Sequence, residues 1–329
     1  MLPFFVLLFA MEGTSNALPP PLGGYGADAE QVSVSGFSSG GYMAVQVHVA
    51  YSKTIMGVGV VGGGPYYCAQ ANVVTAMTAC MQSPSLINVE LLQQITRDAQ
   101  LDNTIDPVSN MENDMVYLYS GTKDITVVKG VVKALVTYYS DFVDQSNVKK
   151  VFNKPSGHAF ITDNYGNGCA TSMGPWINNC SYNQAYEILN HIYGGNLLKP
   201  DSSAAGIFYE FDQTEFVDIT KGVMNSAGYV YVPSNCNSSN SNCKVHVSLH
   251  GCRQGKSFME DKYALHTGYN EVADLNDIIV IYPQANAAPV WNPNGCWDWW
   301  GYTGINYASN LADQMKAIKG MIDRVLSHT

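Results

Sequence analysis

The sequence predicts an α/β fold with a mostly parallel central sheet flanked by helices, and two observations lead to this prediction. Short runs rich in β-branched residues alternate along the chain with longer stretches of helical periodicity. The chain has 329 residues, of which 46% are hydrophobic, enough apolar material for one large core. No internal repeat or low-complexity linker divides it, so we expect residues 18–329 to form a single domain.

The expected strands are short β-branched or aromatic runs separated by polar or glycine-containing turns. In chain order they cover residues 32–34, 57–61, 115–119, 148–152, 208–211, 229–232, 245–249 and 278–282, with 208–211 at the sheet edge. Helices are expected after the first strand and over residues 88–100, 127–142, 183–193 and 310–327. The last helix has apolar residues at helical spacing, namely Leu311, Met315, Ile318, Ile322 and Val325.

The first 17 residues have the features of a secretory signal peptide. Residues 2–11 form an apolar stretch too short to span a bilayer, and Ser15 and Ala17 place small residues at the −3 and −1 positions of a cleavage site. The usual basic residues at the start are missing, and a buried N-terminal strand is the alternative interpretation. We favour a signal peptide over residues 1–17 and therefore expect a secreted, extracellular protein.

Eight cysteines also indicate an oxidising compartment. They fall into close sequential pairs in loop-like sequence, which favours disulfides Cys68–Cys80, Cys169–Cys180, Cys236–Cys243 and Cys252–Cys296. Asn179 and Asn237 begin N-glycosylation sequons. No C-x-x-C pair of zinc ligands occurs, and we expect neither a metal nor a cofactor.

The charge balance narrows the range of partners. With 17 basic and 27 acidic residues the net charge is −10, and no basic run is present. This argues against nucleic acid and against an anionic membrane as partners and favours a neutral substrate. We expect a monomer.

The strongest functional signal is the pentapeptide Gly36-Phe37-Ser38-Ser39-Gly40, which has the pattern G-x-S-x-G. It lies between an expected strand and an apolar, helix-like run, which is the context of a nucleophile elbow. Such a turn holds a serine hydroxyl clear of the sheet, where a base can activate it, and its glycines leave room for the tight bend. Ser38 is therefore the expected nucleophile; a plain Gly/Ser turn is the alternative.

Two later loops supply an acid and a base in the order found in α/β-hydrolases, Ser, Asp, His. Asp124 follows the expected strand 115–119, and His158 follows the next strand, 148–152. A serine nucleophile needs a histidine as base, and the histidine needs a carboxylate to orient it. Asp124 could instead cap the helix expected from 127, and His158 could be an ordinary loop histidine.

The oxyanion hole usually takes one N–H from the residue after the nucleophile, here Ser39, and one from a His-Gly loop after an earlier strand. No His-Gly precedes Ser38, but His250-Gly251-Cys252 follows the strand 245–249 near the other end of the chain. Either the chain lacks this half of the site, or it is circularly permuted. We favour permutation, with the N–H groups of Ser39 and Cys252 forming the hole and His250 shaping the loop.

Three strings of this sequence resemble the fungal secreted poly(3-hydroxybutyrate) depolymerases: V-S-V-S-G-F-S-S-G-G-Y-M-A from residue 32, S-L-H-G-C-R-Q from 248 and N-P-N-G-C-W-D-W from 292. The resemblance covers essentially the whole chain after residue 17. It implies a single-domain, circularly permuted α/β-hydrolase fold stapled by disulfides. It places the triad on Ser38, Asp124 and His158, the oxyanion N–H groups on Ser39 and Cys252, and a substrate-lining tryptophan on Trp297.

The resemblance implies a serine esterase that cleaves poly(3-hydroxybutyrate) to short oligomers and monomers through an acyl-enzyme, acting on solid polyester or on its oligomers. The H-G-C and G-C-W strings also occur in feruloyl and acetylxylan esterases, so a carbohydrate esterase is one alternative. A non-catalytic polymer-binding protein on the same scaffold is another. Trp291, Trp297, Trp299 and Trp300 crowd one loop that Cys296 would tie to the oxyanion loop, and of these Trp297 is the best candidate for contact with the substrate.

Overall fold

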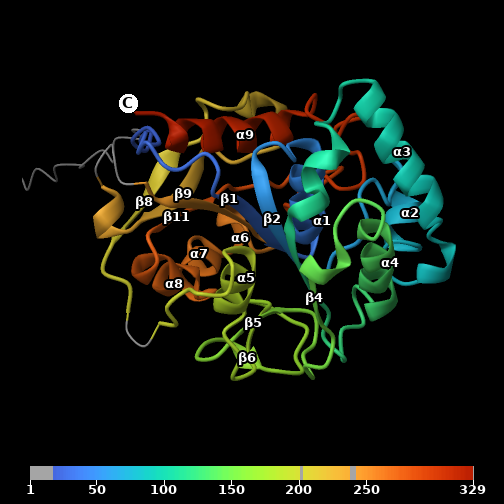
Figure 1. Ribbon diagram of the computed structural model, residues 1–329, viewed down its shortest axis with the longest axis horizontal. Helices are drawn as coiled ribbons and strands as arrows, with labels where there is room; N and C mark the ends of the chain where they lie inside the picture. The colour runs from blue at the N-terminus through green and yellow to red at the C-terminus, as the bar shows by residue number, and fades with distance from the viewer. Residues whose placement is uncertain (1–17, 201–202, 238–241, 329) are drawn as a thin grey trace, which may run out of the picture.

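The structure is a computed structural model that describes residues 18–200, 203–237 and 242–328; the expected signal peptide, 1–17, lies outside this part of the chain. An eight-stranded sheet runs through the molecule with helices on both faces (Figure 1). Its order is β4 (Val148–Val151), β3 (Met115–Tyr119), β2 (Ile55–Val61), β1 (Val32–Phe37), β10 (Lys244–Leu249), β11 (Ile278–Tyr282), β9 (Ala227–Val232) and β8 (Ile207–Asp212).

Strand directions agree with the predicted parallel sheet. Every neighbouring pair from β4 to β11 is parallel, whereas β9 pairs antiparallel with β11 and with β8. The run 208–211, expected at an edge, lies in β8 at the end of the sheet. A small second sheet, ordered β5 (Phe160–Thr162), β7 (Ile177–Asn179) and β6 (Asn167–Gly168), lies in the loop region after β4.

Two apolar clusters fill the spaces between the sheet and its helices. One face packs against α1 (Ser39–Ala50), α3 (Val89–Leu101), α4 (Lys129–Tyr139) and α9 (Asp313–Leu326). The other packs against α5 (Gln184–Ile192), α7 (Lys262–His266) and α8 (Tyr269–Leu275). All residues of α1 are buried, and its two larger polar side chains, Gln46 and His48, have hydrogen-bond partners. Two short helices, α2 (Val73–Met77) and α6 (Lys256–Met259), lie in the loops.

The four expected helices with stated bounds are present, and each begins one to three residues later than expected. The helix expected from 127 begins at Lys129, because residues up to Val127 form a turn around Asp124. The last helix begins at Asp313 rather than at 310, which leaves Leu311 outside it and 47% exposed. Helices of four to seven residues, such as α6 and α8, were not expected, because so short a run carries little periodicity.

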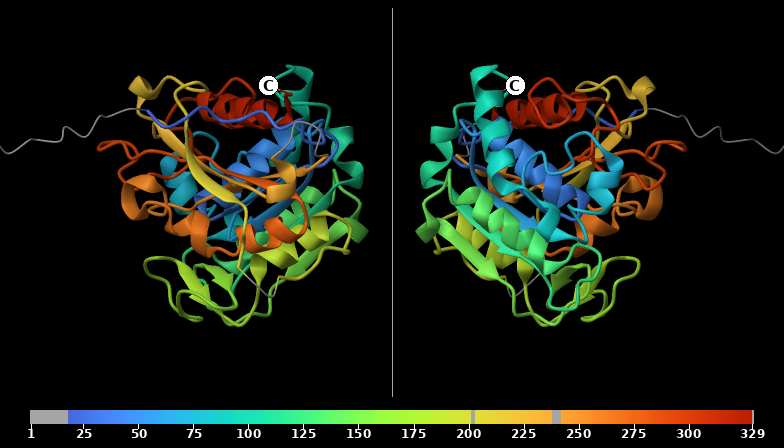
Figure 2. Two further views of the ribbon diagram at one scale, coloured as in Figure 1. Left: turned by 90° about the vertical axis from the view of Figure 1, so that its left-hand side faces the viewer. Right: turned by 90° about the vertical axis from the view of Figure 1, so that its right-hand side faces the viewer.

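The circular permutation is visible in the pairing of β1. This strand lies beside β10, with Val32 opposite Val245 in parallel register. The chain ends meet on the face covered by α9, where the Tyr25 N–H donates to Val325 O (3.1 Å) and the Gly26 N–H to Ser327 O (2.7 Å). Figure 2 shows the N-terminal segment running beside α9. Joining the two ends would therefore restore a continuous order of strands without rebuilding the sheet.

Four disulfides staple the loops, and they are the four pairs favoured by the cysteine spacing: Cys68–Cys80, Cys169–Cys180, Cys236–Cys243 and Cys252–Cys296. Three of them close loops of 7 to 12 residues, whereas Cys252–Cys296 spans 44. Within the described residues no helix has the length and hydropathy needed to cross a bilayer.

Candidate active site

The site is assembled at the carboxyl ends of β1, β3, β4 and β10, where parallel α/β sheets place their ligands. Ser38 joins β1 to α1 and has φ 56° and ψ −120°, a conformation that non-glycine residues rarely adopt. Strain of this kind costs about 1–3 kcal/mol and persists where packing enforces it. The expected strand–turn–helix of a nucleophile elbow is thus present.

Both glycines of the pentapeptide are required by close backbone contacts. A Cβ at Gly36 would lie 2.1 Å from Gly40 O, inside the turn itself. A Cβ at Gly40 would lie 2.1 Å from Leu249 O, at the end of β10. The second contact brings the start of α1 against the strand that leads into the His-Gly loop. The motif therefore also positions the elbow against β10.

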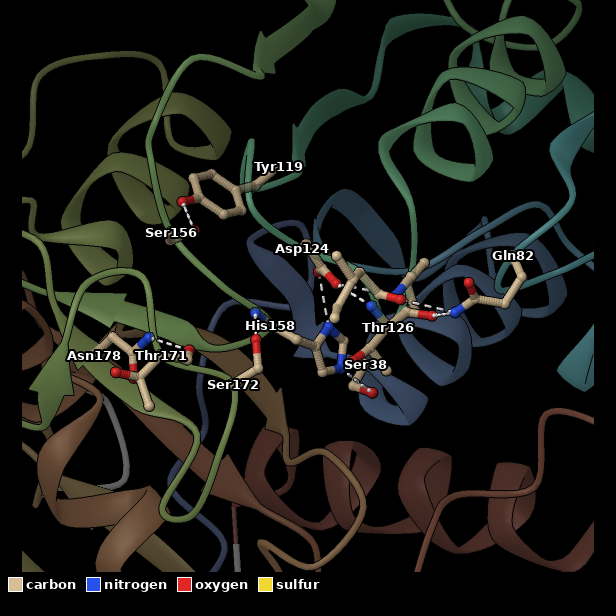
Figure 3. A network of polar contacts seen from close by, with 12 residues as sticks. Ser38, Gln82, Tyr119, Asp124, Thr126, Ser156, His158, Thr171, Ser172 and Asn178 are labelled. Carbon is tan, nitrogen blue, oxygen red and sulfur yellow. Dashed lines mark hydrogen bonds and ion pairs between the residues drawn. The ribbon is translucent and has the colours of Figure 1, made fainter.

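Ser38, His158 and Asp124 form a hydrogen-bonded series, although they lie far apart in sequence (Figure 3). His158 Nε2 is 2.9 Å from Ser38 Oγ, and His158 Nδ1 is 2.8 Å from Asp124 Oδ2. With the proton on Nδ1, the imidazole donates to the carboxylate and accepts from the serine hydroxyl. The His158 and Asp124 side chains are 6% and 4% exposed, so water competes little for these bonds.

Asp124 does not cap α4, the alternative considered for this residue, because that helix begins at Lys129 with Val128 at its N-cap and no side-chain cap bond. Instead, Asp124 holds the turn that precedes the helix. Its Oδ1 accepts the N–H groups of Thr126 (2.8 Å) and Val127 (3.0 Å), while Oδ2 is left for His158. The loops that carry Asp124 and His158 are joined by backbone bonds, from Thr122 N–H to Lys154 O and from Lys123 N–H to Ser156 O. The carboxylate is thereby fixed from both sides before any substrate arrives.

The His158 loop is held by two further hydroxyls, both drawn in Figure 3. Ser172 Oγ accepts the His158 backbone N–H at 2.8 Å. Tyr119 OH, at the end of β3, lies 2.6 Å from Ser156 Oγ. Neither residue was singled out in the sequence, because a serine or tyrosine that supports a loop has no local signature.

The two expected oxyanion residues reach the same cleft. Ser39 is the first residue of α1, whose first N–H groups have no partner within the helix. Cys252 lies in the loop after β10, and both residues line the cleft beside Ser38. Buried Gln254 fixes that loop, because its Oε1 accepts the Gly251 N–H (2.8 Å) and its Nε2 donates to Pro175 O (2.9 Å).

His250 is fully buried below the cleft and serves the loop, as expected. Its Nδ1 is 2.7 Å from Gly251 O, and its Nε2 accepts the Ala285 N–H at 3.2 Å. Burial lowers its pKa to about 4 and that of His246 to about 3, so both are neutral at pH 7. The two stand four residues apart, the spacing of zinc ligands on a helix, but His246 lies on a strand and bonds Ser33 and Ser35.

The cleft above Ser38 has a volume of about 430 Å³ and a largely apolar lining. Trp176, Trp291, Trp299 and Trp300 line it. Trp297 does not: it is 0% exposed and packs against the His250 ring at 5.3 Å between centroids, so it cannot touch a substrate in this structure. The expectation for Trp297 is corrected, because its side chain turns into the core below the loop. Trp176 was missed, as it lies on a different loop, between Cys169 and Cys180.

Known proteins resemble the chain closely, although no protein-family model matches it. A poly(3-hydroxybutyrate) depolymerase of Delftia acidovorans is 45% identical over 305 residues, which cover 92% of this chain and 61% of that protein. A polyhydroxybutyrate depolymerase of Talaromyces funiculosus is 35% identical over 98% of this chain and 96% of its own. The chain thus spans less than two thirds of the first relative and nearly all of the second.

Two solved structures share the fold. The PHB depolymerase of Penicillium funiculosum has a TM-score of 0.86 and is 34% identical, over 94% of this chain and 99% of that one. A serine-to-alanine variant of a PHB depolymerase, complexed with an R3HB trimer, has a TM-score of 0.87 at the same identity and coverage. Sequence identity over almost the full length of the Talaromyces relative, together with the shared permuted fold, shows that this chain belongs to the poly(3-hydroxybutyrate) depolymerase family.

Proposed function

We propose that this protein is a serine esterase that hydrolyses the ester bonds of poly(3-hydroxybutyrate) to short oligomers and monomers through an acyl-enzyme. The observation that carries the proposal is the series Ser38–His158–Asp124 at the floor of an apolar cleft. The family relationship favours this substrate over the feruloyl or acetyl esters of plant carbohydrates, and it favours an enzyme over a non-catalytic binding protein.

The geometry supports a two-step reaction. Ser38 Oγ attacks the ester carbonyl while His158 Nε2 accepts the hydroxyl proton, and Asp124 stabilises the imidazolium that forms. His158 then donates that proton to the leaving 3-hydroxyl oxygen, and the acyl group stays on Ser38. Water, deprotonated by the same imidazole, attacks the acyl-enzyme and releases the acid.

The backbone N–H groups of Ser39 and Cys252 are the proposed oxyanion hole. Both come from rigid parts of the fold, the start of α1 and the loop tied by Cys252–Cys296 and Gln254. Donors fixed in this way need no reorganisation when charge develops on the carbonyl oxygen, and each contributes about 3–4 kcal/mol in comparable sites.

Exposed apolar side chains around the cleft mouth form the proposed polymer-adsorbing surface. Val73, Met77 and Trp291 line the cleft yet remain 54%, 58% and 60% exposed. Ile125, beside Asp124, is 75% exposed, and Val290, beside Trp291, is 79% exposed. Several exposed large apolar side chains at and beside a cleft favour a binding surface, and a solid polyester presents an apolar partner for it. The Trp291→Ala variant is expected to adsorb less polymer while retaining hydrolysis of soluble oligomers.

The decisive experiment is the Ser38→Ala variant, assayed on suspended polymer for released acid and for adsorption. We expect turnover to disappear and adsorption to remain, because the hydroxyl is the nucleophile and contributes little to the apolar surface. Substantial remaining turnover would refute the assignment of Ser38. Release of ferulate or acetate in preference to hydroxybutyrate would identify a carbohydrate esterase, and failure of an organophosphate to label Ser38 in the wild type would identify a binding protein.

We also propose that residues 1–17 are a cleaved leader and that residues 18–329 are one extracellular, monomeric catalytic domain. The four disulfides support an oxidising compartment. Asn179 and Asn237 are exposed and so accessible to glycosylation, although the remainder of the second sequon lies outside the described residues. N-terminal sequencing and intact mass of the secreted protein, with size-exclusion light scattering, test these statements together.

A further inference from the structure

A second cavity of about 440 Å³ continues from the catalytic cleft. Trp176 and Arg253 line both cavities, so the two spaces adjoin at these side chains. Beyond them the second cavity is lined by aromatic and basic groups that include Tyr165, Phe258 and Lys262. We name this second cavity the basic groove.

The charge of the basic groove is opposite to that of the protein. The chain has a net charge of −10, yet among the described residues no aspartate or glutamate lines either cavity. The charged side chains on the basic groove are Arg253 and Lys262, both exposed. Two cations without a carboxylate also line a separate cavity at Lys150 and Lys154, but of the two cavities only the basic groove shares lining residues with the catalytic cleft. Two cations on a path that adjoins the cleft favour an anionic ligand there.

Arg253 is held in position to receive such a ligand. Its backbone N–H donates to Asn294 O at 2.7 Å, and its Nε–H donates to Asn294 Oδ1 at 2.8 Å. The Nε bond fixes the plane of the guanidinium while its two terminal nitrogens have no ion-pair partner among the described residues. A guanidinium fixed by a neutral amide keeps its full charge for a carboxylate, which it can bind through two parallel hydrogen bonds.

We infer the side of the cleft on which the leaving group departs from the position of His158. His158 must protonate the leaving oxygen, so the leaving chain passes His158. Trp176 is tied to the same segment, because the Phe160 N–H, two residues after His158, donates to Trp176 O at 2.9 Å. In a polyester of 3-hydroxy acids the leaving alcohol carries the part of the chain that ends in the free carboxyl group. A leaving chain that passes His158 and Trp176 would carry its free carboxylate into the basic groove, which Arg253 and Lys262 line.

We propose that the basic groove is a subsite for the terminal carboxylate of hydroxy-acid oligomers, and that Arg253 and Lys262 bind this carboxylate. The proposal rests on the proposed esterase function and deepens it. The same enzyme then adsorbs neutral polymer through its apolar rim and binds soluble oligomers by their charged end. Release of short hydroxy acids from the carboxyl end of those oligomers follows.

The test compares a 3-hydroxybutyrate trimer as its free acid and as its methyl ester, which differ by one charge. The measured quantity is the ratio of kcat/KM for the acid to kcat/KM for the ester, because any general damage to the oxyanion loop cancels in it. We expect Arg253→Gln and Lys262→Gln each to lower the ratio about three- to fivefold at low salt, and the double variant about tenfold or more. The wild-type ratio should fall in about 0.5 M salt.

Lys316→Gln is the matched control, since Lys316 is exposed on α9 and lines neither cavity. It removes the same charge and should leave the ratio unchanged. An unaltered ratio in the double variant, or an equal fall in Lys316→Gln, would overturn the subsite. These outcomes are separate from failure of the proposed function, in which the wild type would hydrolyse neither form of the trimer.

Discussion

Two regions of this molecule contain the same series of groups, a carboxylate, an imidazole and a hydroxyl. In the cleft the series is Asp124, His158 and Ser38, with spacings of 2.8 and 2.9 Å. Away from the cleft the series is Asp114, His48 of α1 and Tyr139 of α4, with spacings of 2.9 and 2.9 Å. Hydrogen-bond distances alone therefore do not distinguish a catalytic site from a structural one.

The surroundings distinguish them. Ser38 has a strained backbone, lines the cleft and has the neighbouring N–H groups of Ser39 and Cys252. His48 is 0% exposed and Tyr139 is 0% exposed, within the cluster that packs α1 and α4 onto the sheet. Burial raises the pKa of the Tyr139 hydroxyl well above its usual value, so it stays neutral and acts as a fixed hydrogen-bond partner. The first series is open to a substrate, and the second stabilises the fold.

The largest expected effect is that of His158→Ala on catalysis. Without the base, Ser38 cannot lose its proton, and we expect kcat to fall by about 10⁶-fold. The free energy of unfolding should change less than in His48→Ala, because the His158 ring, although only 6% exposed, lines the cleft, where water can replace it. Steady-state kinetics and chemical denaturation of the same sample provide the check. A fall of less than about 100-fold would mean that the two series have been assigned the wrong way round.

The second largest effect on kcat is expected from Asp124→Asn, which should lower it by about 10⁴-fold. The amide Nδ2 would donate to His158 Nδ1 and so move the imidazole proton to Nε2, facing Ser38. The amide Oδ1 can still accept from Thr126 and Val127, so the thermal midpoint should stay close to that of wild type. Loss of folding in this variant would show that the carboxylate is chiefly structural.

His48→Ala should reverse the pattern. It removes a buried ring and leaves Asp114 and Tyr139 without their partner, which we expect to lower the free energy of unfolding by about 2–4 kcal/mol. Below the unfolding transition, kcat/KM should remain within about threefold of wild type. A large loss of activity in the folded variant would contradict the structural assignment of this series.

A smaller effect is expected from pH through His246 and His250. Their pKa values are lowered by burial to about 3 and about 4 from a usual 6.5, so between pH 6.5 and 4 they are protonated in the unfolded chain but not in the folded one. Their stabilising contribution is complete above pH 6.5 and is lost as pH falls, by about 1.4 kcal/mol per pH unit for each. Denaturant unfolding at pH 7, 6 and 5 measures this slope. The slope should decrease in His246→Gln, which can still bond Ser33 and Ser35; an unchanged slope would refute the attribution.

Much of the candidate site follows from local sequence signals. The strand, the glycine pair and the apolar run around Ser38 are contiguous in the sequence. Together they indicate a nucleophile elbow, whose tight turn leaves no room for a Cβ at either glycine. Asp124 and His158 were found from their places after successive strands. The disulfide pairing could be predicted because three of the four bonds close short loops, in which few other cysteines are within reach. The circular permutation could be predicted because the His-Gly loop, which usually precedes the nucleophile, lies near the other end of the chain.

The direction of side chains and the meeting of distant loops were decided only by the tertiary structure. Trp297 and Trp299 are two residues apart, yet Trp297 packs on His250 in the core while Trp299 stacks on Tyr42 at 4.1 Å and lines the cleft. Trp176 and Arg253 come together through Gln254, a contact across 78 residues. A pattern in sequence indicates which backbone conformation is favoured locally. Which side chain is buried and which remains at the surface depends on how all the loops pack, because burial is a property of the assembled chain.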